Sequence, residues 1–202
     1  MSQDSTHADE ARILGALERQ HAGPKAFRAM SAPVWRNGHL SEKDKHLVAV
    51  AVAQVTRCAF CIEHHAELAR KGGASESEAL AVSYITAALE SLGDATLSIG
   101  KEGFALENEP HLTGTSIATA RAGFVQAVFD TDALKAGFVS VIAAAVAYAQ
   151  SNEARRQLFH RQALEAGEPL GALDEAYSVV VVLRAGAVYA HTLHVASVFA
   201  DG

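Results

Sequence analysis

Both cysteines of the chain lie in one short stretch, residues 57–73, where Cys58 and Cys61 have the CxxC spacing and His64 and His65 follow within one helical turn. The thiolate is the reactive form of cysteine, and a position at the start of a helix lowers the pKa of a thiol. The two-residue spacer lets the sulfurs approach closely enough to bridge, so that one cysteine can attack a substrate and the other can resolve the product as a disulfide. This stretch therefore predicts thiol–disulfide exchange or peroxide reduction.

A helix over this stretch would bring a base to the cysteines. Nothing between Cys61 and Lys71 breaks a helix, and the following Gly72-Gly73 is a typical C-terminal stop. His65 stands four residues after Cys61 and therefore faces the same side, where it can accept the thiol proton or stabilise the thiolate. His64 points about 100° away from His65 around such a helix and has the weaker claim to a role.

Two other interpretations of the cysteine pair stay open. Cys58 and Cys61 could be small buried hydrophobes near a helix start. They could also bind a metal with a histidine, but two thiolates and an imidazole form an incomplete zinc set, and no second CxxC or HxxxH completes it. We therefore expect a redox pair that uses no metal and no organic cofactor.

The composition excludes several classes of partner. The chain has 202 residues, half of them hydrophobic, and a formal net charge of −6 without a basic cluster, which argues against nucleic acid or an anionic membrane as partner. The polar N-terminus lacks the pattern of a signal peptide, and the longest apolar runs are far below the roughly 18 residues that a membrane span needs. We expect a cytoplasmic protein, in which a lone cysteine pair is redox-active or metal-binding rather than a structural disulfide.

Helical periodicity and capping residues predict an all-α chain. Strand propensity in residues 179–182 is expected to yield to the helical surroundings. Residues 107–114 read as a loop, and residues 130–132 as the cap of the helix that follows them. The expected helices cover residues 9–20, 25–30, a segment capped by Ser41, 61–71, a segment opened by the capping box of Ser75 and Glu78, 95–102, 115–129, 133–150, a segment capped by Ser151 or Asn152, and 172–199.

The two halves of the chain resemble each other. In each, an apolar helix leads to a polar helix, a glycine stop and a further helix. Aligning His46 with Phe138 sets Gln150 opposite Cys58 and Glu153 opposite Cys61, so the second copy has lost the chemistry and kept the packing. We expect a first half over residues 1–106 that carries the site, and a degenerate second half over residues 107–202 packed with it as one globular unit.

The apolar helix, the Cys58/Cys61 pair, His65, Gly72-Gly73-Ala74 and the capped acidic helix resemble the alkylhydroperoxidase AhpD-like / carboxymuconolactone decarboxylase family over about residues 40–90. The resemblance implies an all-α fold and a homo-oligomer, commonly a trimer or hexamer. It also implies a peroxidase that reduces a hydroperoxide and is restored by a dithiol reductant or reductase protein. In that family pattern Cys61 attacks the peroxide, Cys58 resolves the product and His65 belongs to a proton relay.

One residue departs from the family pattern. Members usually carry a glutamate twelve residues before the first cysteine, and here that position is His46. Histidine can pass protons near neutral pH, so His46 is the expected relay residue, with Glu42 or Glu63 as substitutes. The decarboxylase branch usually lacks the CxxC pair, so decarboxylation is not expected. The alternative to a peroxidase is a redox-sensing or disulfide-exchanging interaction protein that does not turn over.

A few further residues carry weaker predictions. His191 and His194 stand three apart on the last expected helix and could face a ligand or metal, but a partly buried, hydrogen-bonded pair is the favoured interpretation. Trp35 and Tyr84 could line a substrate pocket, although core packing is the more common role for such side chains.

Overall fold

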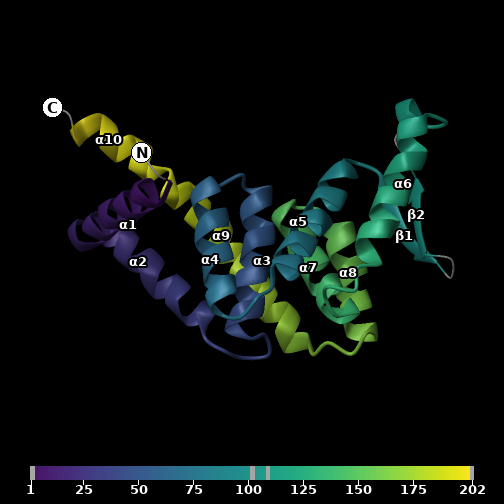
Figure 1. Ribbon diagram of the computed structural model, residues 1–202, viewed down its shortest axis with the longest axis horizontal. Coiled ribbons are helices and arrows are strands. Elements are labelled where there is room, and N and C mark those ends of the chain that lie inside the picture. The colour runs from purple at the N-terminus through teal and green to yellow at the C-terminus, as the bar shows by residue number, and fades with distance from the viewer. Residues whose placement is uncertain (1–2, 101–102, 108–109, 201–202) are drawn as a thin grey trace.

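The computed structural model describes residues 3–100, 103–107 and 110–200, and these are mostly helical (Figure 1), which confirms the predicted helical fold. The elements in chain order are α1 (Gln3–Gln20), α2 (Ala22–Ser31), the 3-10 helix η1 (Ala32–Trp35), α3 (Glu42–Val55), α4 (Ala59–Lys71), α5 (Glu76–Ser91), β1 (Thr96–Gly100), β2 (Gly103–Glu107), the 3-10 helix η2 (Pro110–Leu112), α6 (Ser116–Phe129), α7 (Ala136–Ala149), α8 (Glu153–Glu165), α9 (Leu170–Ala190) and α10 (Thr192–Ala200).

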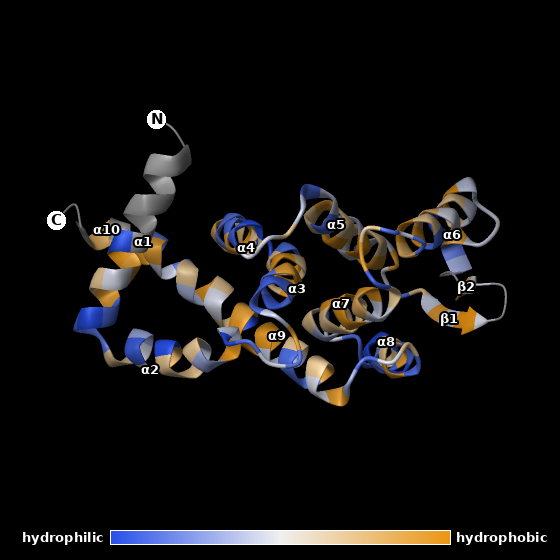
Figure 2. Ribbon diagram, turned by 60° about the horizontal axis from the view of Figure 1, so that its bottom comes forward, coloured by the Kyte–Doolittle hydropathy of each residue, from blue (hydrophilic) through white to orange (hydrophobic). Residues whose placement is uncertain are grey.

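The core is built around α3 and α7, which lie side by side and are flanked by α5 and α9 (Figures 1 and 2). Residues 45–53 of α3 are buried without interruption, and α7 is buried along nearly its whole length. A helix that is apolar on all sides is stable only when it is covered on all sides, which is why these two segments occupy the centre. The sequence prediction of a buried helix after Ser41 is confirmed.

The two halves are related, as predicted, but with a different register. Helices α3, α4 and α5 begin at residues 42, 59 and 76, and α7, α8 and α9 begin 94 residues later, at 136, 153 and 170. The left-handed residue before each polar helix also repeats, at Arg57 (φ 56°) and Ser151 (φ 61°). Asn152, and not Gln150, is therefore the equivalent of Cys58. The sequence alignment was wrong by two residues because helices that are apolar all round do not fix a register by hydrophobicity.

Residues 95–102 were predicted to be a helix, and this prediction was wrong. The structure has an antiparallel hairpin in which Thr96 of β1 pairs with Glu107 of β2 and Gly100 pairs with Gly103. Leu97 and the neighbouring apolar residues alternate with polar or small ones, which is the period of a strand. Gly103 has φ 105°, a left-handed conformation that glycine adopts without strain. Residues 101 and 102 lie outside the described residues.

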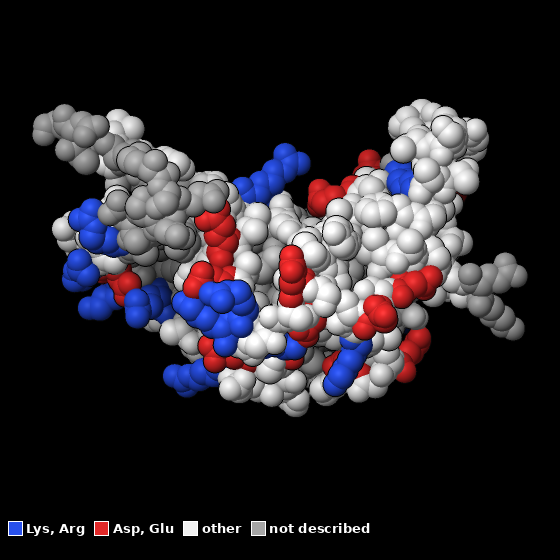
Figure 3. Space-filling view, viewed as in Figure 1, with Lys and Arg blue, Asp and Glu red and all other residues white. Residues whose placement is uncertain are grey.

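The N-terminal helices extend further than predicted. The sequence Gly23-Pro24 was expected to end the first helix, but it lies in the first turn of α2, Ala22–Ser31. A proline is tolerated in a first turn because the missing N–H would have no partner inside the helix. The two helices, α1 and α2, form one end of the molecule (Figure 1), and Figure 3 shows lysine and arginine side chains over this end interspersed with acidic ones.

Two further boundaries differ from the prediction. Residues 130–132 do not cap α7, because Asp130 ends α6 and the N-cap of α7 is Lys135, without a side-chain hydrogen bond. The last helix is not continuous, since His191 separates α9 from α10. The predicted division between residues 106 and 107 falls at the end of β2 and stays a prediction. The predicted loop 107–114 holds η2 and includes residues 108–109, which lie outside the described part.

The stretch Leu170–Ala196 is long and apolar enough, by length and composition alone, to cross a membrane, which the sequence analysis did not anticipate. Helix α9 forms most of this stretch and packs against α3 and α7, with Ala172, Leu173, Ala176 and Val179 fully buried. The packing of α9 explains part of this apolar composition, since 39% of the apolar window is buried inside the structure.

Candidate redox site

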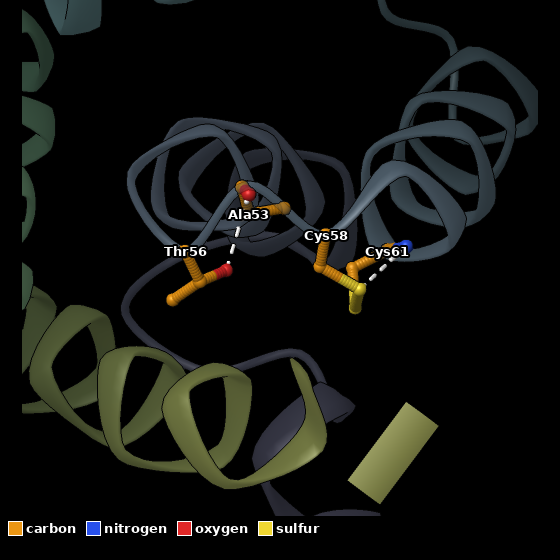
Figure 4. The surroundings of a disulfide bond; sticks show 4 residues. All are labelled: Ala53, Thr56, Cys58 and Cys61. Atoms are coloured by element: carbon orange, nitrogen blue, oxygen red, sulfur yellow. Dashed lines mark hydrogen bonds between the residues drawn. A yellow bond between two sulfur atoms is a disulfide. The ribbon is translucent and has the colours of Figure 1, made fainter. Parts of the chain in front are cut away.

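A tight turn between α3 and α4 sets the cysteine pair at the start of α4 (Figure 4). The chain leaves α3 through Arg57, and the backbone N–H of Cys58 donates to the carbonyl of Ala53 at 3.1 Å. The Thr56 hydroxyl donates to the same carbonyl at 3.1 Å. Cys58 is consequently the N-cap of α4 in extended conformation, as the CxxC pattern predicted.

Cys58 and Cys61 form a disulfide with a Cα–Cα distance of 5.2 Å. The backbone N–H of Cys61 donates to the Cys58 sulfur at 3.2 Å, so this sulfur takes the place of the usual capping oxygen (Figure 4). A thiolate on Cys58 would be stabilised here by this N–H and by the positive end of the helix dipole. Both cysteines are buried, Cys58 to 2% and Cys61 to 6% exposure.

His65 contacts His46, the residue that replaces the glutamate of the family pattern. Their Nδ1 atoms lie 3.0 Å apart, and both side chains are buried. Two Nδ1 atoms form a hydrogen bond only when one of them carries a proton and the other is bare. When both rings are neutral, the donor ring therefore has a bare Nε2 and the acceptor ring carries its proton on Nε2.

Glu42 favours one of the two arrangements. Its carboxylate lies 3.9 Å from Nε2 of His46, one helical turn earlier on α3. The negative charge favours a proton on His46 Nε2, so that His65 donates from Nδ1 and keeps its own Nε2 bare. Glu63, the other acidic candidate from the sequence, is exposed on α4.

Burial keeps this pair neutral. The pKa of His65 is lowered to about 3, mainly by loss of hydration, with additional charge repulsion from His64 and His46. Burial also lowers the pKa of His46, although Glu42 opposes that shift and His64 adds to it. Near neutral pH both rings are therefore uncharged, which is the state in which His65 can act as a base.

An indole ring covers both histidines. The Trp35 ring centroid lies 4.9 Å from that of His46 and 4.8 Å from that of His65, with interplanar angles of 13° and 28°. Trp35 is the last residue of η1 and the only tryptophan of the chain. Core packing is the more common role for a tryptophan, but the Trp35 ring lies over the candidate relay and lines the cavity described next.

A cavity of about 220 Å³ opens beside the disulfide. Cys61 and His65 line it, and Cys58 is not among its lining residues. The N-terminal helices and α9 complete its walls, which are mostly apolar and contain no lysine or arginine among the described residues. The full lining consists of Leu14, Phe27, Ser31, Trp35, Phe60, Cys61, His64, His65, Val182, Leu183, Gly186, Tyr189 and Ala190.

The equivalent positions of the second half carry side chains of different chemistry. Arg155, equivalent to Cys61, is buried and donates to the carbonyls of Gly93 at 2.6 Å and Ala95 at 2.8 Å. Phe159, equivalent to His65, packs on Phe129 with ring centroids 5.3 Å apart. The second half therefore lacks the cysteines and the histidine pair at the equivalent positions, although a cavity lined by Asn152, Glu153 and Arg155 lies beside its turn.

The remaining predicted residues lie elsewhere or differ from expectation. His64 lines the cavity and stacks on Phe60, with centroids 5.8 Å apart, despite its weaker claim from sequence. Tyr84 is 54% exposed and belongs to neither the core nor the cavity. His191 and His194 are both exposed, so the prediction of a partly buried pair was wrong. Among the described residues, no cluster of three or more His, Cys, Asp or Glu side chains could hold a metal ion.

Comparison with known proteins identifies the first half. Residues 22–96 match the carboxymuconolactone decarboxylase family. A protein of Paracoccus denitrificans, described as uncharacterized protein 4 in cox locus, is 40% identical over 75 residues, which cover 37% of this chain and 68% of that relative. The chain belongs to the carboxymuconolactone decarboxylase family.

The match to the carboxymuconolactone decarboxylase family contains Trp35, His46, Cys58, Cys61 and His65 and ends at the start of β1. The fold is shared along the whole chain with a putative gamma-carboxymuconolactone decarboxylase subunit from Burkholderia xenovorans LB400, with a TM-score of 0.70 and 17% identity over 100% of this chain and 99% of that one. The second half therefore keeps the family fold where its sequence has diverged.

Proposed function

We propose that this protein is a thiol-dependent peroxidase that reduces a hydroperoxide and cycles Cys58 and Cys61 between dithiol and disulfide. The observation that carries the proposal is the position of Cys61, which lies at the start of α4 and lines an apolar cavity together with His65. His65 in turn contacts His46 in a buried pair. A nucleophile, a base and a space for a small substrate therefore meet at one place.

In the first step His65 accepts the proton of the Cys61 thiol at its bare Nε2. The Cys61 thiolate attacks the distal peroxide oxygen and breaks the O–O bond. Cys61 becomes a sulfenic acid, and the departing alkoxide takes the proton held by the histidine pair and leaves as an alcohol. The orientation that Glu42 favours in the pair supports this role for His65, because it leaves Nε2 without a proton.

In the second step the Cys58 thiolate attacks the sulfur of the Cys61 sulfenic acid and expels hydroxide, which is protonated to water. This forms the disulfide that the structure contains. An external dithiol then attacks Cys61, the cysteine that lines the cavity, and Cys58 leaves as a thiolate. The N–H of Cys61, which donates to the Cys58 sulfur, stabilises that leaving group. The two cysteines thus have different roles, with Cys61 attacking and Cys58 resolving.

Two alternatives have less support. A disulfide-exchange or redox-sensing protein needs a sulfur that a macromolecular partner can reach, but Cys58 and Cys61 are 2% and 6% exposed. A lactone decarboxylase acting on a carboxylated substrate would be expected to offer a cation, and the described cavity lining contains no lysine or arginine. The apolar cavity favours a peroxidase that acts on a small or partly apolar hydroperoxide over both of these alternatives.

We further propose a homo-oligomer, a trimer or hexamer, in the cytoplasm. Val188, Val195, Val198 and Phe199 of α9 and α10 are between 61% and 80% exposed. Apolar side chains gathered on one helical surface are typical of protein interfaces, which supports association between copies.

The deciding experiment is peroxide consumption by reduced protein with excess dithiothreitol. We expect turnover of cumene hydroperoxide or hydrogen peroxide by the wild-type protein. Cys61→Ser should abolish it, whereas Cys58→Ser that has been reduced and then freed of dithiothreitol should consume a single equivalent and accumulate a sulfenic acid that dimedone labels. If reduced wild-type protein consumes neither peroxide, the peroxidase proposal is wrong. A change in assembly that depends on redox state would then favour the sensor.

A further inference from the structure

We propose that Trp35 is a positioning residue that clamps the His46–His65 pair and holds its shared proton in one orientation. The proposal rests on the proposed function, in which His65 is the base for Cys61. It goes beyond that function because it assigns a role to a residue outside the CxxC segment, on a different element of the fold.

The geometry of the three rings carries this proposal. The hydrogen bond between His46 and His65 joins ring edges, whereas Trp35 lies over ring faces, 4.9 and 4.8 Å from their centroids. The two histidine rings are themselves inclined by 28° to each other. An imidazole can rotate about its last side-chain bond, and this rotation would break the contact between the Nδ1 atoms. A flat ring in contact with both faces blocks the rotation of both histidines.

The segment that presents Trp35 is anchored at several points. Lys45, which is buried, donates to the carbonyl of Arg36, the residue after Trp35, and forms an ion pair with Glu175 at 3.0 Å. The backbone N–H groups of His39 and Leu40 donate to the same Glu175 carboxylate at 3.0 and 2.9 Å. The indole is therefore held by contacts that reach α3 and α9.

These contacts also keep the carboxylate of Glu175 ionised. Burial would raise its pKa, but the hydrogen bonds from Leu40, His39 and Lys45 outweigh that effect and lower the pKa. The carboxylate therefore stays charged near neutral pH and keeps the anchor in place. No comparable set of contacts would be needed if Trp35 only filled space at the surface of the cavity.

Two effects of the indole on the histidine pair act in opposite directions. An aromatic face attracts a protonated imidazole, which favours protonation. Covering the rings removes water, which disfavours it, and burial is the largest cause of the low pKa of His65. At His65 the loss of hydration therefore outweighs the attraction of the indole face, and the pKa is lowered. The titratable and charged groups around the pair are Glu42 and Lys45 on α3, His64 on α4, and Glu175 and Tyr189 on α9.

The test compares Trp35→Phe, which keeps a flat ring, with Trp35→Leu, which keeps an apolar side chain but cannot cover two ring faces. Nitrogen-15 NMR of histidine-labelled protein distinguishes protonated from bare ring nitrogens. In the wild type and in Trp35→Phe, we expect His46 to have a bare Nδ1 and His65 to have a bare Nε2. In Trp35→Leu, we expect both rings to exchange between the two forms.

A second measurement follows the thiol without peroxide. The rate of alkylation of Cys61 by iodoacetamide at pH 6, in a Cys58→Ser background, should fall on the order of 10-fold in Trp35→Leu and about 2-fold or less in Trp35→Phe. Circular dichroism must show that Trp35→Leu is folded; if it is not, Trp35→Met replaces it in both measurements.

The outcomes separate this proposal from the peroxidase proposal. Fixed proton positions in Trp35→Leu, or equal alkylation rates in all variants, would overturn the role of Trp35 even if the protein is a peroxidase. Loss of the fixed positions in a protein that consumes no peroxide would support Trp35 and reject the peroxidase.

Discussion

Cys58 and Asn152 occupy the same position in the two halves of the chain. Both are N-caps of the second helix of their half, with nearly identical backbone angles of φ −90°, ψ 96° and φ −95°, ψ 92°. The Cys58 sulfur accepts a hydrogen bond from Cys61 N, and the Asn152 carboxamide oxygen accepts one from Arg155 N. The two halves therefore share one backbone design, and only the side chains decide which half carries redox chemistry.

Introducing cysteines into the second half should recreate the bridge without the activity. In Asn152→Cys/Arg155→Cys, built on Cys58→Ser/Cys61→Ser, we expect a disulfide to form on oxidation because the backbone matches that of the first half. Peroxide turnover should stay at the background level, because Ser140 and Phe159 occupy the positions of His46 and His65. Thiol titration before and after oxidation checks the bridge. Turnover near the wild-type rate would show that the histidine pair is dispensable.

Arg155 should stabilise the fold rather than act in chemistry. Replacing it with methionine leaves the carbonyls of Gly93 and Ala95 without their donor, and we expect the free energy of unfolding to fall by about 2–4 kcal/mol. Urea denaturation measures this loss. Arg161→Met on the exposed side of α8 is the matched control and should change stability by about 0.5 kcal/mol or less. A loss no larger than the control's would contradict the structural role.

The histidine pair should make the protein less stable in mild acid. The pKa of His65 is about 3 in the folded protein and 6.5 for the ordinary side chain, so between these values the unfolded chain binds a proton that the folded chain does not. Above pH 6.5 His65 is neutral in both states and does not lower the free energy of unfolding. As the pH falls from 6.5 toward 3, proton binding by the unfolded chain lowers the free energy of unfolding by about 1.4 kcal/mol per pH unit.

Urea denaturation of oxidised protein at pH 7 and pH 5 measures this effect. The free energy of unfolding should fall by about 2 kcal/mol in the wild type. The drop should be smaller in His46→Ser/His65→Phe, which copies the side chains of the second half. An equal drop in both proteins would show that other groups cause the acid sensitivity.

Filling the cavity should exclude large substrates first. A Cβ built on Gly186 would lie 3.4 Å from the Phe27 ring, and both residues line the cavity. We expect Gly186→Leu to lower kcat/KM for cumene hydroperoxide about 10-fold or more and for hydrogen peroxide about 3-fold or less. Gly123→Ala on α6, with no atom within 4 Å of its added Cβ, is the control and should change neither. Equal loss for both peroxides would mean that substrate does not enter here.

Local signals in the sequence predicted much of the first half correctly. The N-caps Ser41 and Ser75, the capping box with Glu78 and the placement of Cys58 at a helix start all depend on residues within one turn of each other. His65 on the same helix face as Cys61 follows from helical spacing alone. These features could be derived because their partners are neighbours in the chain.

Features that depend on contacts between distant segments could not be derived from local spacing: the resemblance, and not the spacing, put His46 in a relay with His65, and the role of Trp35 was missed. The contact of His46 with His65 crosses from α3 to α4, and the cover by Trp35 comes from a third element. The register of the second half was wrong because Phe138 and its neighbours lie on a helix that is buried on all sides and has no distinguishing face. The hairpin was missed because five alternating residues are too few to outweigh a helical composition.

The second half, in which neither cysteine is repeated, sets the electron capacity of the protein. Asn152 and Arg155 occupy the positions of Cys58 and Cys61, so each chain has a single sulfur pair, which holds two electrons when reduced and none when oxidised. A reduced chain without added reductant can therefore consume one molecule of hydroperoxide and then stop. In any assembly, the amount of hydroperoxide consumed in this single turnover would equal the number of chains, because each chain has one cysteine pair in its first half.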